Sequence, residues 1–477
     1  MADQINSEAE RFEEGVGQES QTGPSASHND GDTRDPEEAH RPHTAIQMEA
    51  LDPSWVSKIN EKHLVGTRTS EVSWTSISCS IHRVPHMLRI QNEKAYDPKV
   101  ISIGPFHYKK REGQLKFMEE HKRRYLNDIL SRNANGQSKL EQCFVAIKEL
   151  EEKARKCYSE VIELDSYSFV EMMILDGCFI IEFFRKDLVK DYEDDPIFKL
   201  GWLNRAVGFD LIMLENQIPF FILQRLFGLT NVSSPSSSLV EWALNFYGHE
   251  WDLITEERIK NSGINIQHLL HLLHTKHRMP TKENQSEQGL VIIPSASKLE
   301  EGGIQFRKRE RDKCTTVLDI NFQNGVIEIP RTQFWDQTNI ELLNYIAFEQ
   351  CYCHSKKHFT TYTIFMDCLI NNIKDVEILC REGIIANWLG SDEELAAAYN
   401  KMGRELALCH KDFYLGGVCK DINRYCKSAW PKLRASLVHD YFKNPWAIIS
   451  FIAALILLLL TMTQTFFSSF PKFAYGK

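Results

Sequence analysis

Cysteine and histidine side chains that could bind a metal ion are concentrated between Cys351 and His358, in the run CYCHSKKH. Thiolates and imidazoles are the usual ligands of zinc, but structural zinc sites combine two groups of such ligands at characteristic spacings. Cys368 and Cys380 follow singly and do not make a second group. We therefore predict a surface or half-buried loop here, and we expect no metal and no cofactor.

Four histidines recur every three residues in the run HLLHLLHTKH, at His268, His271, His274 and His277. On a helix, steps of three residues drift around the axis, so only neighbouring histidines could share an ion. The pattern favours an amphipathic helix that buries its leucines and carries the histidines on its flank.

Acidic side chains inside apolar runs are the candidates for acid–base chemistry, above all Asp176 and Glu182. A carboxylate buried among apolar groups needs a partner, and Arg185 and Arg225 are available in the neighbouring apolar segments. Structural ion pairing is therefore our interpretation, with a catalytic pair as the alternative.

Glu215 and Asn216 stand just before Pro219, where the missing N–H of proline breaks any helix. We expect their side chains to satisfy backbone groups freed at that break. Two further runs, Arg83-Val-Pro85 and Gly104-Pro105-Phe106-His107, are interpreted as turns or as a recognition surface.

The motifs of the common enzyme classes are missing from the sequence. Its glycines match neither a phosphate-binding loop nor a dinucleotide fingerprint, and no Gly-x-Ser-x-Gly elbow of a serine hydrolase is present. The sequence thus indicates no particular reaction and favours a protein that is not an enzyme.

Apolar periodicity predicts a mainly α-helical body that must position these groups. The run at 168–187 is apolar nearly all round, which is typical of a helix in a core. A second core helix is predicted over 209–227, broken at Pro219 and restarted. The other predicted helices span 115–130, 142–161, 239–246, 264–277, 339–349, 361–372, 376–382, 392–410 and 415–442.

One β signal stands out among the helices. Alternating apolar runs at 317–322 and 326–329 flank Asn324-Gly325, the strongest short-range cue for a hairpin. The run from Ile304 to Phe306 could add a third strand, and residues 100–103 should be extended. We therefore expect one small antiparallel hairpin or sheet beside the helices.

The N-terminal residues 1–72 are polar and acidic, and we interpret them as a disordered arm. Residues 1–50 hold twelve Asp or Glu against three Lys or Arg, so the arm carries much of the chain's net charge of −9. No basic domain stands out, and we expect no nucleic-acid partner. The remaining predicted divisions are a helical domain at 73–443 with a mobile loop at 278–292, an anchor at 444–470 and a tail at 471–477.

The run from Asn444 to Pro471 contains no charged residue and predicts one transmembrane helix, because a bilayer core of about 30 Å takes roughly 20 apolar residues to cross. Its partner would be the lipid bilayer. The residues assigned to the span are Ala447, Ile448, Ile449, Phe451, Ile452, Leu455, Ile456, Leu457, Leu458, Leu459, Leu460, Phe466 and Phe467.

Flanking charges predict the orientation of that helix. Five Lys or Arg residues lie between Arg424 and Lys443, against Lys472 and Lys477 after the span. The positive-inside rule then places the body in the cytosol as a tail-anchored protein, and the plasma membrane is weakly favoured. The first residues lack a secretory signal, so the twelve cysteines should be free thiols, most of them buried.

These motifs, in this order, make the chain similar to a plant family known as domain of unknown function 247. The residues that carry the resemblance include Arg83, Pro85, Gly104, Pro105, Asp176, Gly177, Glu215, Asn216, Pro219, Glu349 and Gln350. The resemblance covers about Cys79 to Phe470. It implies a single-pass membrane protein and offers no catalytic residues.

Some grass relatives are implicated in pollen self-incompatibility, which suggests recognition or signalling rather than catalysis. We therefore expect a membrane-anchored recognition or signalling protein with a protein partner. The alternative is a membrane-bound enzyme acting on a small molecule or lipid, for which Asp176, Glu182, Glu215 or His82 would have to converge in one pocket.

Overall fold

The computed structural model describes residues 79–132, 136–230, 238–248, 259, 263–277, 291–310, 316–408, 412–428 and 445–469. All of them belong to a unit that spans Trp74–Lys477. Helices predominate and the strands are short, so the fold class is mainly α, as predicted. The predicted arm, the tail and most of the predicted loop at 278–292 lie outside the described residues.

The helix α6 (Ser166–Val189) lies at the centre of the N-terminal half of the body. It begins where the Asp165 carboxylate accepts a hydrogen bond from the backbone N–H of Ser168, and it ends at Lys190, whose φ of 57° is left-handed. Fifteen of its residues are buried, on all sides of the helix. The prediction of a core helix at 168–187 is confirmed, since only complete burial suits such a sequence.

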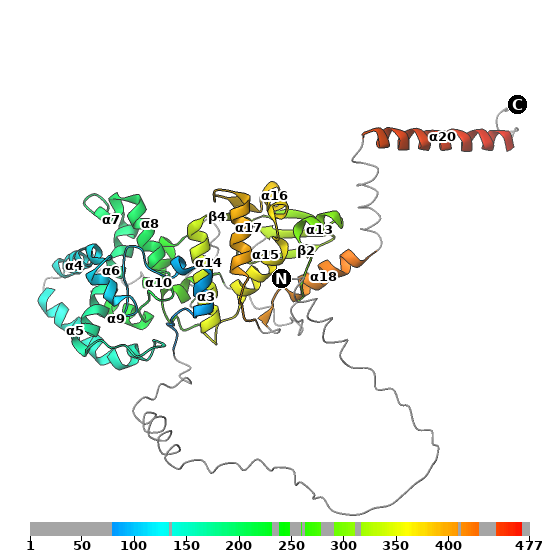
Figure 1. Ribbon diagram of the computed structural model, residues 1–477. Coiled ribbons are helices and arrows are strands. Elements are labelled where there is room, and N and C mark those ends of the chain that lie inside the picture. Colours follow the sequence, from blue (N-terminus) through cyan, green and yellow to red (C-terminus); the bar gives the residue numbers. More distant parts are fainter. Residues whose placement is uncertain are drawn as a thin grey trace, which may run out of the picture. The chain divides into compact units, whose positions relative to one another are not determined.

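Four helices pack around α6: α4 (Lys116–Ser131), α5 (Gly136–Arg155), α9 (Phe220–Thr230) and α10 (Leu239–Phe246) (Figure 1). Gly177 lets α9 approach, because a Cβ there would lie 2.4 Å from the Leu226 Cδ1 atom. The rings of Tyr125, Phe179 and Phe183 stack in the shared core. Burial of each such side chain contributes roughly 1.5–3 kcal/mol to the free energy of unfolding.

The predicted helix at 209–227 is only half right. The helix α7 (Pro196–Lys199) is followed by α8 (Gly201–Asp210), and the chain then runs without regular structure until α9 begins directly after Pro219. The restart after the proline is confirmed, but the helix before it is wrong. Residues 211–219 are held instead by side-chain hydrogen bonds, as the Gln217 amide donates to the carbonyls of Leu211 and Met213.

Other helix ends differ from prediction where a polar group intervenes. α5 ends at Arg155 rather than at residue 161, because that guanidinium donates to the carbonyls of Ile162 and Leu164 and holds the next segment extended. The helix α12 (Leu269–Lys276) begins late, with His268 as its N-cap. The helix α17 (Asp392–Met402) stops before Gly403 rather than continuing to residue 410.

The predicted hairpin is confirmed, although its strands are short. The strand β2 (Asn321–Gln323) pairs antiparallel with β3 (Val326–Pro330), and the turn residues Asn324 and Gly325 have φ angles of 53° and 78°, which suit a primed hairpin turn. The strand β1 (Gln305–Arg309) pairs with β3 in parallel, so the sheet is mixed rather than antiparallel throughout.

A second sheet escaped prediction. The strand β4 (Thr332–Phe334) pairs in parallel with β5 (Ile385–Asn387), and strands of three residues are too short to show an alternating pattern. The helices of this half (Figure 1) share a second core. They are α13 (Ala296–Glu301), α14 (Asp336–Cys351), α15 (His358–Leu369), α16 (Ile373–Arg381), α17 and α18 (Gly416–Lys427). The rest of the helix predicted to reach residue 442 lies outside the described residues.

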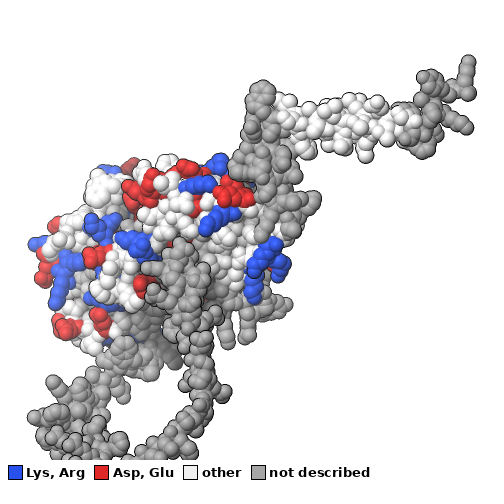
Figure 2. All heavy atoms as spheres, turned by 45° about the vertical axis from the view of Figure 1, so that its right-hand side comes forward, with Lys and Arg blue, Asp and Glu red and all other residues white. Residues whose placement is uncertain are grey.

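The last described element is α20 (Pro445–Ser469). Its segment Ile449–Phe466 has a mean hydropathy of 2.1, so this helix is long and apolar enough to cross a membrane. None of that segment is buried inside the protein. It bears no charged side chain (Figure 2). The hydroxyls of Thr461 and Thr463 donate to backbone carbonyls one turn earlier, at 2.7 Å, so these polar groups are satisfied within the helix. The side chains of Ala447, Ile448 and Phe467 lie outside the described part.

Candidate functional site

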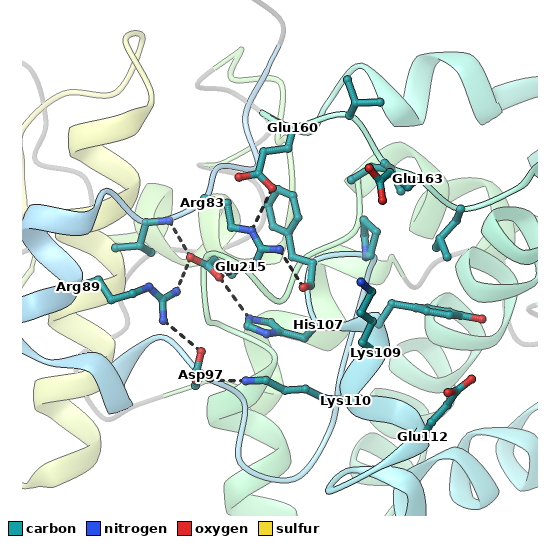
Figure 3. A pocket seen from close by; sticks show the side chains of 17 residues that line it. Arg83, Arg89, Asp97, His107, Lys109, Lys110, Glu112, Glu160, Glu163 and Glu215 are labelled. Atoms are coloured by element: carbon teal, nitrogen blue, oxygen red, sulfur yellow. Dashed lines mark hydrogen bonds and ion pairs between the residues drawn. The ribbon is translucent and has the colours of Figure 1, made fainter.

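A polar cavity of about 960 Å³ lies where three distant segments of the chain meet. Its walls come from the helix α3 (His86–Gln91) and the residues before it, from residues 105–112, which end in the 3-10 helix η4 (Tyr108–Glu112), and from residues 160–164. Glu215, from the irregular segment before Pro219, reaches into it (Figure 3). We call this cavity the Glu215 pocket.

The Glu215 carboxylate is 1% exposed and organises the pocket. One oxygen accepts hydrogen bonds from the backbone N–H of Val84 at 2.8 Å and from the Arg89 guanidinium at 2.5 Å, and the other accepts from the Arg83 guanidinium at 2.9 Å (Figure 3). Donors from α3 and from the residues just before it thus converge on one buried charge. Such charge-assisted bonds are about twice as strong as neutral ones.

Both arginines also make contacts outside the Glu215 carboxylate. Arg83 bonds to Glu160 at 3.2 Å, donates to the carbonyl of Phe106 at 3.0 Å and lies 4.3 Å from the centre of that ring. Arg89 pairs with Asp97 at 3.1 Å. Each guanidinium therefore ties the buried carboxylate to a second wall, so the pocket walls are held in fixed positions.

The third basic group beside Glu215 is His107, whose Nε2 lies 3.4 Å from a carboxylate oxygen. Burial, followed by the charge of Lys110, lowers the pKa of His107 to about 4. The imidazole is therefore neutral at physiological pH and contributes no charge to the pocket.

The rim of the Glu215 pocket is charged and exposed. Lys109, Glu112, Glu160, Val161 and Glu163 line it and reach solvent. Lys109 is the cation of this set and Glu112, Glu160 and Glu163 are its carboxylates, so the rim presents charges of both signs above a rigid floor (Figure 3).

The segment that leads to His107 is extended but has no neighbouring strand. Its backbone N–H groups at Val100 and Ile101 donate to the Asp210 carboxylate at 2.7 and 2.9 Å, and that of Ile103 donates to the Asn216 amide oxygen at 2.7 Å. Side chains thus replace a β-partner. Asn216 does satisfy backbone groups, but those of this distant segment rather than the groups at the Pro219 break that the prediction named.

Gly104 continues the segment with a φ of 72°, and a Cβ there would lie 2.3 Å from the carbonyl oxygen of Gln217. Its N–H donates to Asp176 at 2.8 Å. Only glycine fits this left-handed position against another backbone. Pro105 follows and directs the chain into the pocket wall.

Asp176 is fully buried and forms ion pairs with Arg111 at 2.5 Å and Lys122 at 2.9 Å. Burial alone would raise the pKa of Asp176, but these two cations outweigh it and lower that pKa. The predicted ion pairing of Asp176 is confirmed, but its partners are Arg111 and Lys122 rather than Arg185 or Arg225. For Glu182, the prediction includes the partner: Arg185 pairs with it at 2.9 Å.

Glu349 forms a separate buried cluster on α14. It accepts hydrogen bonds from the backbone N–H groups of Phe359 and Thr360, at 2.9 and 2.7 Å, and from His274 at 2.8 Å. A carboxylate at this place satisfies the first turn of α15. Gln350 beside it accepts a hydrogen bond from the backbone N–H of Ala407.

The histidines of α12 are buried rather than on an exposed flank. Their rings at positions 268, 271 and 274 pack against Phe348 of α14. His268 Nδ1 accepts the N–H of His271, while Nε2 contacts the Ser80 carbonyl at 3.2 Å as a donor. The acceptor role of Nδ1 requires a neutral ring, and burial lowers the pKa of His268 to about 3.

The structure brings together only some of the predicted site residues. Arg83 and Glu215 meet in the pocket, Pro85 precedes α3 as its N-cap, and Gly104, Asp176 and Asn216 support the wall. Asp176, Glu182 and Glu215 bind different partners, and His82 contacts the Cys79 carbonyl. The four groups required by the enzyme alternative therefore form no acid–base pair.

Sequence reasoning did not single out Arg89 and Asp97, which line the pocket, or Arg111, Lys122 and Asp210, which support its wall. His107 lies in the run interpreted above as a turn or a recognition surface, and Asp97 shortly precedes that run, so its position was the available signal. In the described part of the chain, no three His, Cys, Asp or Glu residues are grouped to hold a metal ion. Cys143, Cys157, Cys178 and Cys419 are buried free thiols.

The similarity to known proteins covers the helical body and extends into α20. Residues 81–460 match the profile of a family described as DUF247, plant protein of unknown function. The chain is 33% identical to UPF0481 protein At3g47200 of Arabidopsis thaliana over 81% of this chain and 86% of that protein. It is 24% identical to the putative UPF0481 protein At3g02645 of the same plant, over 88% and 96%. No solved structure matches.

Proposed function

The chain belongs to the plant DUF247 family, and from that premise we propose that it is a membrane-anchored recognition protein whose helical body binds a protein partner at the Glu215 pocket. The family carries no established activity, so the proposal depends on the pocket itself. The observation that carries it is that both oxygens of the buried Glu215 carboxylate accept hydrogen bonds from three residues of another segment, Val84, Arg83 and Arg89.

Both oxygens of the Glu215 carboxylate already accept hydrogen bonds from groups of its own chain, which favours a structural role over that of a general base. Here the charge holds three segments of chain in fixed positions. A rigid floor with an exposed, mixed-charge rim suits complementary docking, because charge patterns select partners and orient them. Lys109 and Glu163 on the rim are the groups offered to the partner.

Membrane attachment is the second part of the proposal, and α20 supports it by its length and apolar composition. The basic residues before the helix favour a cytosolic body, at the plasma membrane. An N-terminal tag should then be removed by protease added to sealed microsomes. Protection of the tag would instead place the body in the lumen or outside the cell.

Proximity labelling in plant cells tests partner binding. The full-length chain is compared with a rim variant, Lys109→Glu with Glu163→Lys, and with a control, Arg123→Glu, which alters an exposed residue of α4 outside the pocket. We expect a discrete set of neighbours that the control keeps and the rim variant loses. Identical sets for all three proteins would contradict docking at this pocket.

A further inference from the structure

A second cavity, of about 770 Å³, lies between α8 and α10 on one side and β4 and α14 on the other. It shares no lining residue with the Glu215 pocket. Its size falls within the range of small-molecule sites in proteins. Aromatic rings make up much of its wall: Phe209, Phe246, Tyr247, Trp335, Tyr345 and Phe359.

Two arginines from distant parts of the chain line the same cavity. Arg205 lies on α8, and Arg331 lies between β3 and β4. Within the described residues, neither guanidinium forms an ion pair or a side-chain hydrogen bond, and both are exposed. Two cations without partners thus face one aromatic cavity.

The acidic groups of the wall are already engaged. Asp187 accepts the hydroxyl of Tyr192 at 2.6 Å, and Glu341 accepts that of Tyr345 at 2.9 Å. The amide oxygen of Asn204, beside Arg205, is buried in the wall without a hydrogen-bond partner in the part of the chain that the structure describes. Among the described residues, the wall thus holds two guanidinium groups without an ion pair, and two buried polar atoms without a hydrogen-bond partner: the Asn204 amide oxygen and the Thr332 hydroxyl.

We propose that this cavity binds an organic anion with an apolar, ring-bearing body. Its carboxylate or sulfonate is held by Arg205 and Arg331, since a guanidinium pairs with such groups through two parallel hydrogen bonds. Its rings pack among the aromatic side chains, which favour edge or offset contacts. This ligand differs in class from a protein partner, and its site is separate from the Glu215 pocket.

The test measures binding of 2-naphthoate to the full-length chain in lipid nanodiscs by isothermal titration calorimetry, with empty nanodiscs as the blank. The uncharged 2-naphthamide has the same rings and is the matched probe. We compare the native chain with the double variant Arg205→Gln with Arg331→Gln, and with Arg123→Gln, an exposed arginine outside both cavities.

We expect saturable binding of naphthoate that the double variant weakens at least about tenfold, the effect of losing charge-assisted hydrogen bonds. The Arg123→Gln protein should bind as the native chain does, and naphthamide should bind weakly to all three. Both arginines are exposed, so circular dichroism should show an unchanged fold. Absence of saturable binding by the native chain, or equal affinities for the double variant and the control, would overturn the proposal.

Discussion

Replacement of Glu215 by Gln tests whether this carboxylate holds the pocket together. The change keeps the shape of a side chain that is 1% exposed but removes its charge and turns one acceptor into a donor. That donor then faces the N–H of Val84 or the guanidinium groups of Arg83 and Arg89. Removal of one partner from a buried ion pair costs about 3–5 kcal/mol.

The loss of free energy of unfolding is smaller here, because the side chains of Arg83 and Arg89 are 39% and 25% exposed and keep Glu160 and Asp97 as partners. We therefore expect the free energy of unfolding to fall by about 3 kcal/mol, at the lower end of that range.

Urea denaturation of the full-length protein in detergent, followed by tryptophan fluorescence, measures this change. Glu163→Gln is the matched control, since it removes an exposed carboxylate from the rim of the same pocket and should change stability by about 0.5 kcal/mol or less. If Glu215→Gln and Glu163→Gln unfolded at the same urea concentration, the buried carboxylate would not be the group that fixes the walls.

Three further predictions concern separate parts of the chain. Gly104→Ala should lower the free energy of unfolding by about 3 kcal/mol or more through strain and overlap, whereas Gly228→Ala, on the exposed side of α9 with nothing within 4 Å of its Cβ, should not lower it in the same denaturation assay. The pKa of His268 is about 3 in the folded protein against an ordinary value of 6.5, so the unfolded chain binds the proton first as pH falls. The contribution of neutral His268 to the free energy of unfolding is therefore fully present above pH 6.5 and is lost as the pH falls towards 3. The variant His268→Asn, which can still cap α12, should make the free energy of unfolding depend less on pH, as measured by urea titrations at several pH values. Leu457→Arg places a charge in the middle of α20 at a cost of about 2.5–3.5 kcal/mol, and the protein should then become extractable from membranes by alkaline carbonate, while Leu457→Ala should stay in the pellet.

Elements with a strong local pattern could be predicted from the sequence. The apolar run of α6, the Asn324-Gly325 turn and the apolar helix α20 each follow from residues that are close together in the chain. Their boundaries depended on side chains that local patterns do not reveal. The end of α5, for example, is determined by a guanidinium that bonds to carbonyls of the following segment.

The polar scaffold of the pocket could not be predicted in the same way. Glu215 and Asp176 were recognised as carboxylates that need partners, but the partners Arg83 and Arg111 lie 132 and 65 residues away in sequence. Periodicity carries no information at such separations. Of the nearby arginines that the sequence suggested, Arg185 does pair with Glu182, whereas Asp176 pairs with Arg111 and Lys122.

The extended segment that ends at Gly104 has a consequence for the order of folding. Its N–H groups at Ile101, Ile103 and Gly104 bond to side chains that lie 109, 113 and 72 residues further along the chain. Contacts between residues close in sequence cannot form these hydrogen bonds, because α6 and the segment around Asn216 must first fold and pack. In pulse-labelling hydrogen exchange during refolding, the amide protons of Ile101 and Ile103 should gain protection later than those within α6. The Glu215 pocket would then be among the last parts of the protein to form, after both of its distant walls have been synthesised and packed.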